Sequence, residues 1–225
     1  MDMPTVGKAR KGRGAVSNES GRFEQEKRVA FDDGWGPAEA EPARVATTWS
    51  VDATRTIIAR NDSPDIGFDR SINPYRGCEH GCIYCYARPS HAYLGLSPGL
   101  DFETRIFYKP QAAALLRGEL RKKGYNCRPI ALGSNTDPYQ PAERKLGITR
   151  AILEVLREFR HPVTIVTKSA LVQRDIDILS DMAKDRLAVV TLSVTTLDRA
   201  LARVLEPRAA TPERRLETIG APSSW

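Results

Sequence analysis

The 225-residue sequence has no apolar run near the ~20 residues that cross a bilayer, and its start, MDMPTVGKARKGRG, lacks the apolar stretch of a secretory signal. We therefore expect a cytoplasmic protein with no membrane partner. With 16 glycines and 15 prolines the chain is not collagen-like or low in complexity, and a 41% hydrophobic content excludes a wholly disordered protein. Length and composition predict one large domain or two small ones with a sizeable core.

The net charge bears on possible partners, and the distribution of charged residues bears on the organisation of the chain. The net charge of +6 permits a polyanionic partner such as nucleic acid without requiring one. Residues 1–45 carry eight basic and eight acidic side chains without a sustained apolar period, so we predict a mostly disordered N-terminal segment and a core over residues 46–225. In that segment a basic arm would contact phosphates or form a solvated tail: Lys8, Arg10, Lys11 and Arg13. Three aromatic residues would anchor part of the segment on the folded core: Phe23, Phe31 and Trp35.

From Val45 onward, strand and helix patterns alternate. Apolar runs at 163–166 and 187–192 indicate parallel strands buried on both faces, so the fold class expected is α/β. Polar residues at predicted strand ends are site candidates: Ser134, Asn135, Lys168 and Ser193. The remaining patterns predict strands at 48–60, 71–77, 105–109 and 128–135, and helices at 110–123, 142–160, 174–185, 197–205 and 212–219.

Four cysteines occur, and three of them crowd into CEHGCIYC as C-x3-C-x2-C: Cys78, Cys82 and Cys85. Clustered thiolates bind iron–sulfur clusters or zinc, and a structural zinc would need Cys127, His80 or His91 as a fourth ligand. A four-iron cluster on three cysteines leaves one iron open to an exogenous ligand, which suits catalysis. We favour the iron–sulfur site, with zinc and incidental cysteines as alternatives.

The segment NPYRGCEHGCIYCYARPSH resembles the cluster loop of radical S-adenosylmethionine enzymes, and more narrowly the spore photoproduct lyase-like (DNA repair photolyase-like) subgroup. SNTDPYQPAE, TKS and EPRAATPERRLETI support that subgroup, and the resemblance runs from about residue 45 to residue 219. It implies a partial parallel (β/α) barrel and a [4Fe-4S] cluster on Cys78, Cys82 and Cys85. The open iron of that cluster would chelate S-adenosylmethionine, which is cleaved reductively to a 5′-deoxyadenosyl radical.

The resemblance also implies cofactor-binding positions, whereas no catalytic residue is assigned. Tyr84 matches a family position near the adenine. Ser134, Asn135 and Thr136 match the segment near the methionyl amino group. Lys168 and Ser193 match strand ends that face the carboxylate or the ribose. Residues 135–138 also suit an Asx-type turn, and Lys168 a solvated strand end.

Several other residues have more than one possible role. Tyr86, His91 and Tyr93 would line a substrate channel or serve as packing residues, and His161 looks like a helix end. We expect Cys127 to be a buried small apolar residue, with a redox role as the alternative. No cysteine lies between Ala131 and Asp137, where spore photoproduct lyase has its hydrogen donor, so repair of that lesion is not expected.

Length bears on the fold and on activity. The 140 residues after Cys85 hold about four β/α units of about 30 residues, fewer than the family's partial barrel, so we expect a C-terminally truncated product with an open edge at 187–192. The predicted function is a lyase-like radical S-adenosylmethionine enzyme with nucleic acid as the leading substrate guess and a reductant such as flavodoxin or ferredoxin. Alternatives are a non-catalytic zinc- or cluster-binding nucleic-acid module and an inactive truncated remnant.

Overall fold

The computed structural model describes residues 10–24 and 45–220. Lys8, Phe31 and Trp35 lie outside the described residues, and the disorder expected of residues 1–45 stays a prediction. No helix in the described part of the chain has both the length and the apolar character of a membrane span.

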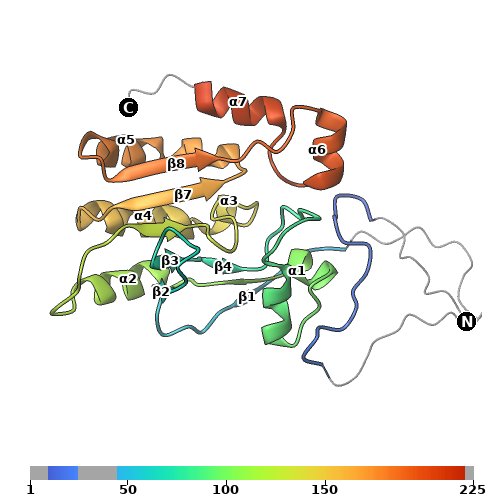
Figure 1. Ribbon diagram of the computed structural model, residues 1–225, viewed down its shortest axis with the longest axis horizontal. Coiled ribbons are helices and arrows are strands. Elements are labelled where there is room, and N and C mark those ends of the chain that lie inside the picture. The colour runs from blue at the N-terminus through green and yellow to red at the C-terminus, as the bar shows by residue number, and fades with distance from the viewer. Residues whose placement is uncertain (1–9, 25–44, 221–225) are drawn as a thin grey trace, which may run out of the picture.

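A five-stranded sheet forms the centre of the molecule (Figure 1). Its strands lie in the order β2 (Ala59–Arg60), β3 (Arg70–Ile72), β6 (Ile130–Leu132), β7 (Val163–Thr167) and β8 (Ala188–Leu192). The last four are parallel to one another, and β2 is an edge strand antiparallel to β3. The predicted α/β class is confirmed. In the described residues the sheet is open, with β2 and β8 at its edges, so no closed barrel is present and the partial barrel stays a prediction.

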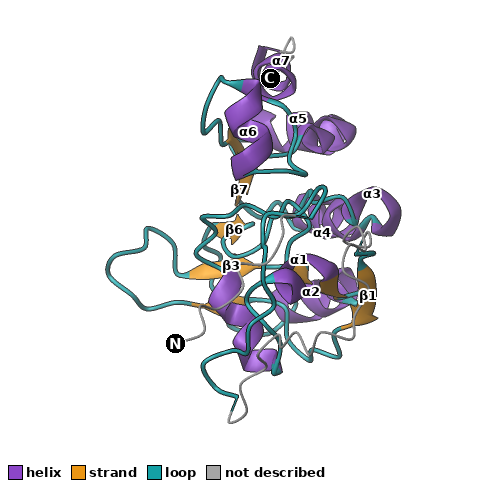
Figure 2. Ribbon diagram, turned by 90° about the vertical axis from the view of Figure 1, so that its right-hand side faces the viewer, coloured by secondary structure: helices purple, strands orange, loops and turns teal. Residues whose placement is uncertain are grey.

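Three helices cover one face of this sheet: α2 (Ala112–Leu120), α4 (Ile148–Glu158) and α5 (Ile176–Lys184) (Figure 2). Helices form in these segments because apolar residues recur at helical spacing on one face. The helix α4 contacts both α2 and α5. The core lies between these helices and the strands, and its centre includes Leu116, Leu132, Ile152, Leu156, Ile165 and Leu179. Each such side chain contributes about 1.5–3 kcal/mol when fully buried.

The expectation that β7 and β8 are buried on both faces is wrong. Burial alternates along each strand, and Thr164, Val166, Val189 and Thr191 are exposed. The helices α4 and α5 lie on only one face of the sheet (Figure 2). Because side chains alternate between the two faces of a strand, every second residue of β7 and β8 is left exposed.

The helix predicted over 142–160 is two helices, α3 (Glu143–Leu146) and α4. Gly147 separates them with a φ of 63°, a left-handed conformation that glycine adopts without a Cβ penalty. The helix predicted from residue 174 likewise begins earlier, as the 3₁₀-helix η2 (Ala170–Asp175), because the Ser169 hydroxyl accepts a hydrogen bond from the Leu171 N–H.

A second, three-stranded sheet leads into the cysteine loop, the name we give to residues 78–85. Its order is β1 (Thr48–Val51), β5 (Arg105–Tyr108) and β4 (Tyr75–Arg76). The cysteine loop leaves β4 and leads into the 3₁₀-helix η1 (Arg88–Leu94) and then α1 (Leu100–Thr104). Beyond the β8 edge lie α6 (Arg199–Leu205) and α7 (Pro212–Gly220) (Figure 1).

Candidate metal centre

The cysteine loop, residues 78–85, carries three free thiols, of which those of Cys78 and Cys82 are buried and that of Cys85 is half-buried. The loop turns sharply at Gly81, where φ is 67°. A Cβ at this glycine would lie 2.8 Å from Oε2 of Glu103, so both the backbone conformation and the available space require glycine. The turn allows the three thiols to share one loop.

Hydrogen bonds from the backbone of two segments and from the Gln140 side chain hold the cysteine loop in place. The Cys78 N–H donates to the Phe102 carbonyl at 2.9 Å and the Ile83 N–H to the Leu205 carbonyl at 3.0 Å. The Gln140 side chain accepts from the Glu79 N–H at 2.9 Å and donates to the Gly77 carbonyl at 3.1 Å. Segments that follow β6 and β8 therefore fix the position of the loop.

Arg88 holds the loop from its own C-terminal side. Its guanidinium donates to the Cys82 carbonyl at 2.8 Å and to the Glu103 carboxylate at 2.5 Å. The Glu103 side chain is fully buried, so this ion pair is shielded from solvent.

His80, between two of the cysteines, forms a buried ion pair with Asp137. His80 Nδ1 lies 3.2 Å from Asp137 Oδ2. Burial opposes the positive charge on His80, but Asp137 and the Cys78 sulfur raise the pKa of its imidazole to about 10. Burial would raise the pKa of Asp137, yet His80 and hydrogen bonds from the Lys168 N–H and the Thr167 hydroxyl bring that pKa below its usual range. One carboxylate thus joins the cysteine loop to the ends of β6 and β7.

Asp137 also accepts from the Tyr139 N–H at 2.8 Å, so an Asx-type turn is present over residues 137–139, two residues later than the one expected over 135–138.

Asn73, directly after β3, holds the segment that follows β6. Its amide donates to the Ser134 hydroxyl at 3.2 Å, and its oxygen accepts from the N–H groups of Asn135 and Thr136 at 2.9 and 3.3 Å. The Thr136 hydroxyl is buried and donates to the Tyr75 carbonyl, so this side chain stabilises the backbone at Tyr75. Of the three, Ser134 and Asn135 keep partly exposed side chains.

Lys168, at the end of β7, faces the cysteine loop. Its ammonium lies 5.9 Å from the centroid of the Tyr84 ring. Burial, together with the Cys78 and Cys85 sulfurs, raises the pKa of Cys82 to about 12, and the Lys168 charge opposes this rise. The same charge opposes the rise in the pKa of Cys85. Lys168 therefore stabilises negative charge at Cys82 and Cys85, and Arg88 does so at Cys85 as well.

Tyr84 is tied to the segment after β8. Its hydroxyl lies 3.1 Å from that of Thr195 and donates to the Glu206 carboxylate. Glu206 is paired with Arg215, and both side chains are buried. Arg215 also donates to the Ser193 carbonyl at 2.9 Å, so Ser193 is joined to Tyr84 through Arg215 and Glu206.

The remaining sequence candidates are placed as follows. His91 is buried, with Nε2 3.0 Å from the Arg105 carbonyl, and is a packing residue. Tyr86 and Tyr93 are exposed, and the Tyr86 hydroxyl contacts the Ser134 carbonyl. The expectation that Cys127 is buried is wrong, because it lies in the exposed connection before β6.

Residues 10–24, which we name the N-terminal strap, cover the outer side of the cysteine loop. The N–H groups of Gly14 and Ala15 donate to the Glu103 carboxylate at 3.0 and 2.8 Å. The Arg13 side chain is buried and donates to the Glu103 carbonyl at 2.8 Å. A Cβ on Gly14 would overlap the carbonyl oxygen of Gly81, so strap and loop are in direct contact.

Sequence reasoning did not find the contacts by which several polar residues hold the site together: Asn73, His80, Glu103, Asp137, Gln140 and Glu206. His80 was considered only as a zinc ligand and Asp137 only as part of a turn. All of these residues except Glu103 lie inside the sequence motifs, so their positions were a signal, but nothing in the spacing shows which side chains meet.

The donor set suits a soft metal centre. Three free thiols on one loop, with a lysine charge beside them, match the ligands of an iron–sulfur cluster. Among residues 10–24 and 45–220, no three His, Cys, Asp or Glu side chains converge closely enough to hold a single metal ion. A four-iron cluster does not require such convergence, because each cysteine binds its own iron.

Fold and site together define an α/β protein with a three-thiol loop at the carboxyl edge of its parallel strands. The sequence profile of the Radical SAM superfamily matches residues 72–221, and the chain belongs to that superfamily.

An uncharacterized protein of Mycobacterium tuberculosis is 40% identical over 68% of this chain and 45% of its own length. Uncharacterized proteins of Acidianus two-tailed virus and Methanocaldococcus jannaschii are 31% and 28% identical, each over 66% of this chain, covering 50% and 52% of their own lengths. The chain thus spans about half the length of these relatives. No solved structure gives a significant match.

Proposed function

We propose that the chain is a radical S-adenosylmethionine enzyme that holds a [4Fe-4S] cluster on Cys78, Cys82 and Cys85. The observation that carries this proposal is the set of three free thiols on one rigidly held loop beside Lys168. When bound, the cluster would supply the electron that cleaves the sulfonium of S-adenosylmethionine to a 5′-deoxyadenosyl radical.

The chain's own residues have distinct tasks in this proposal. Lys168 offers an ammonium for the carboxylate of S-adenosylmethionine. This proposal is supported by the Lys168 ammonium lying 5.9 Å from the centroid of the Tyr84 ring and by the link from Tyr84 through Glu206 and Arg215 to Ser193. Asn73 orients the segment of Ser134 and Asn135 toward the methionyl amino group. These groups position the cofactor, and none is assigned a role in substrate chemistry.

Water exclusion is a further task of the chain. The N-terminal strap and the buried Glu103 cover the outer side of the cysteine loop. Such a cover limits the access of solvent and dissolved oxidants to the loop and so reduces side reactions of reactive species.

We further propose that the chain belongs to the spore photoproduct lyase-like subgroup, with a partial barrel, lyase-like chemistry, nucleic acid as the substrate class and cytoplasmic location. What supports the subgroup is the set of segments SNTDPYQPAE, TKS and EPRAATPERRLETI, together with the open run of parallel strands. A one-electron donor such as flavodoxin or ferredoxin would reduce the cluster.

Anaerobic reconstitution tests the proposal. About four irons and four sulfides per chain, with 5′-deoxyadenosine formed from S-adenosylmethionine and dithionite, are expected for the wild type. Cys82→Ala should lose both the cluster and the product, whereas Cys127→Ala, which changes an exposed cysteine, should retain both.

Two other outcomes select the alternatives. One zinc per chain and no iron would replace the enzyme by a zinc-binding module. A full cluster without 5′-deoxyadenosine would indicate an inactive protein.

A further inference from the structure

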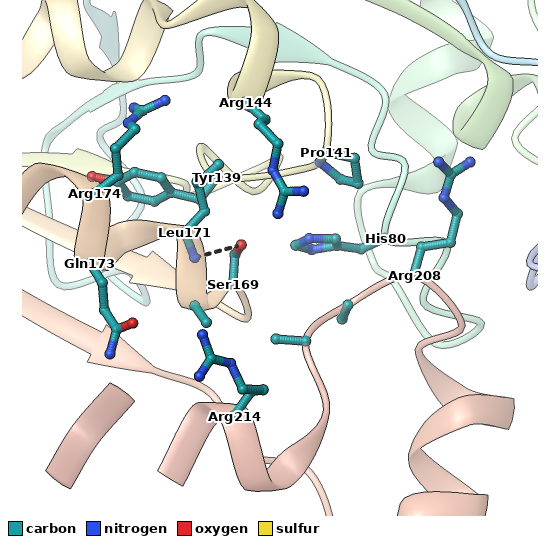
Figure 3. A pocket seen from close by; sticks show the side chains of 13 residues that line it. His80, Tyr139, Pro141, Arg144, Ser169, Leu171, Gln173, Arg174, Arg208 and Arg214 are labelled. Atoms are coloured by element: carbon teal, nitrogen blue, oxygen red, sulfur yellow. Dashed lines mark hydrogen bonds between the residues drawn. The ribbon is translucent and has the colours of Figure 1, made fainter. Parts of the chain in front are cut away.

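A cavity of about 700 Å³ opens beside the cysteine loop, between α3, η2 and the segment that joins α6 to α7 (Figure 3). Four arginines line it, and none of the described residues of its wall is Asp or Glu: Arg144, Arg174, Arg208 and Arg214. A concave wall with one sign of charge attracts ligands of the opposite sign. The cavity is therefore a candidate anion site.

Two of the four arginines are already paired. Arg174 contacts the carboxylates of Glu143 and Asp175, each at 2.7 Å, and both carboxylates are fully buried. Arg208 lies 3.4 Å from the buried Glu79. These two side chains brace the wall of the cavity, and their charge is largely compensated.

The other two arginines are available to a ligand. The side chain of Arg144 has no hydrogen-bond or ion-pair partner among the described residues. Among the residues that the structure describes, Arg214 forms its ion pair only with Glu217 of its own helix, at 2.7 Å, and both groups are more than half exposed. Figure 3 shows the two guanidinium groups entering the cavity from opposite sides, with the His80 ring and Ser169 between them.

The cavity is distinct from the proposed cofactor face. None of the candidate cofactor residues lines it: Tyr84, Ser134, Asn135, Thr136, Lys168 and Ser193. His80 is the link between the two, because it belongs to the cysteine loop and forms part of the cavity wall.

We propose that this cavity binds a phosphate-bearing ligand, with Arg144 and Arg214 holding its phosphoryl oxygens. The planar guanidinium fork matches phosphate geometry, and a wall without carboxylates does not repel the anion. This inference goes beyond the proposed reaction, because it needs neither the cluster nor S-adenosylmethionine.

Two kinds of ligand present the same phosphate group to the cavity: a small phosphorylated molecule and the backbone of a nucleic acid. A second cavity, of about 620 Å³, adjoins the first and shares Pro141 and Arg208 with it. Lys145 lies in its wall, 5.1 Å from the ring centroid of the partly exposed Trp49. A small phosphate would occupy only the first cavity, whereas a strand would extend to Lys145 and could stack a base on Trp49.

Equilibrium binding to the full chain at low ionic strength tests the inference. The probes are inorganic pyrophosphate, followed by calorimetry, and a fluorescein-labelled single strand of about 12 nucleotides, followed by anisotropy. The double variant Arg144→Gln/Arg214→Gln should bind pyrophosphate about tenfold or more weakly, because two charged hydrogen-bond donors are lost. Arg157→Gln/Arg203→Gln removes the same charge from exposed positions outside both cavities and should change Kd by less than about twofold.

Lys145→Gln separates the two sources. If it weakens the oligonucleotide alone, the ligand is a nucleic acid strand, and if only pyrophosphate binds, the ligand is a small phosphorylated molecule. The inference is overturned if neither probe binds, or if both double variants lose affinity equally. Because the readout is binding, a failure of reductive cleavage leaves this test intact.

Discussion

His80 Nδ1 lies 3.2 Å from Asp137 Oδ2, and this buried pair joins the cysteine loop to the carboxyl ends of β6 and β7. The loop is thereby fixed to the sheet by a side chain that stands between two of its cysteines. The geometry of the thiols depends on a carboxylate from another part of the chain.

Asp137→Asn should destabilise the protein by about 2 kcal/mol, because the charged hydrogen bonds to His80 and the Lys168 N–H are weakened. The cysteine loop should then hold less iron. Denaturant unfolding and iron content after reconstitution measure the two effects. Asp185→Asn, at an exposed ion pair with Arg160, is the control, and equal behaviour of the two variants would contradict the role of Asp137.

Asn73→Ala should weaken S-adenosylmethionine binding by about tenfold while iron content stays at the wild-type level. The reason is that Asn73 holds Ser134 and Asn135, whereas it has no hydrogen bond to the cysteine loop among the described residues. Equilibrium binding to the reconstituted protein gives the affinity. Asn126→Ala, at an exposed position, is the control, and an unchanged affinity in Asn73→Ala would remove Asn73 from the site.

Arg215→Met should cost about 3–5 kcal/mol of unfolding free energy, because it leaves the buried Glu206 carboxylate without its cation. The neighbouring Arg214→Met breaks an exposed pair with Glu217 and should cost less than about 1 kcal/mol. Urea unfolding of both variants measures the difference. Similar losses in the two would mean that burial of the Glu206–Arg215 pair does not matter.

Glu206 also predicts a pH dependence. Burial raises its pKa, but hydrogen bonds from Thr195, Tyr84 and Arg215 bring that pKa below the ordinary value of 4.5. A carboxyl group with a lowered pKa in the folded state stabilises the protein above pH 4.5, and this stabilisation disappears as the pH falls through the folded-state pKa.

Glu206→Gln should therefore be less stable than wild type at pH 7 and should lose less stability between pH 5 and pH 3. Unfolding free energies across this range provide the measurement. Glu154→Gln, at an exposed position, should follow the wild-type curve. A Glu206→Gln curve parallel to that of the wild type would show that Glu206 does not carry the dependence.

Gly14→Ala should speed the loss of the cluster in air several-fold, because a methyl group at this position would overlap the Gly81 carbonyl and lift the N-terminal strap from the loop. Decay of the cluster's visible absorbance measures the rate. Gly67→Ala adds the same methyl group in open space and should decay like the wild type. Equal decay of all three proteins would mean that the strap does not protect the cluster.

The order of strands and helices was predictable because it depends on local periodicity. The alternation of apolar strands with amphipathic helices predicted the parallel sheet, and the strand at 128–135 is found in it as β6. The strand at 105–109 is found as β5 of the second sheet, and those predicted at 48–60 and 71–77 are each two short strands that belong to different sheets. Errors arose where a single backbone position interrupts a pattern, as at Gly147, or where covering of a face was assumed, as at Val166 and Val189. Burial depends on which elements pack together, and periodicity alone does not contain that information.

By itself the sequence determined the three-thiol loop, the α/β class and the polar residues at strand ends, since each is a property of neighbouring residues. Only the tertiary structure decided which distant side chains meet: His80 with Asp137, Glu206 with Arg215, and Arg144 facing Arg214 across one cavity. Such contacts follow from strand order and from the placement of helices along the sheet. Both arise from packing between segments far apart in the chain, which no local pattern encodes.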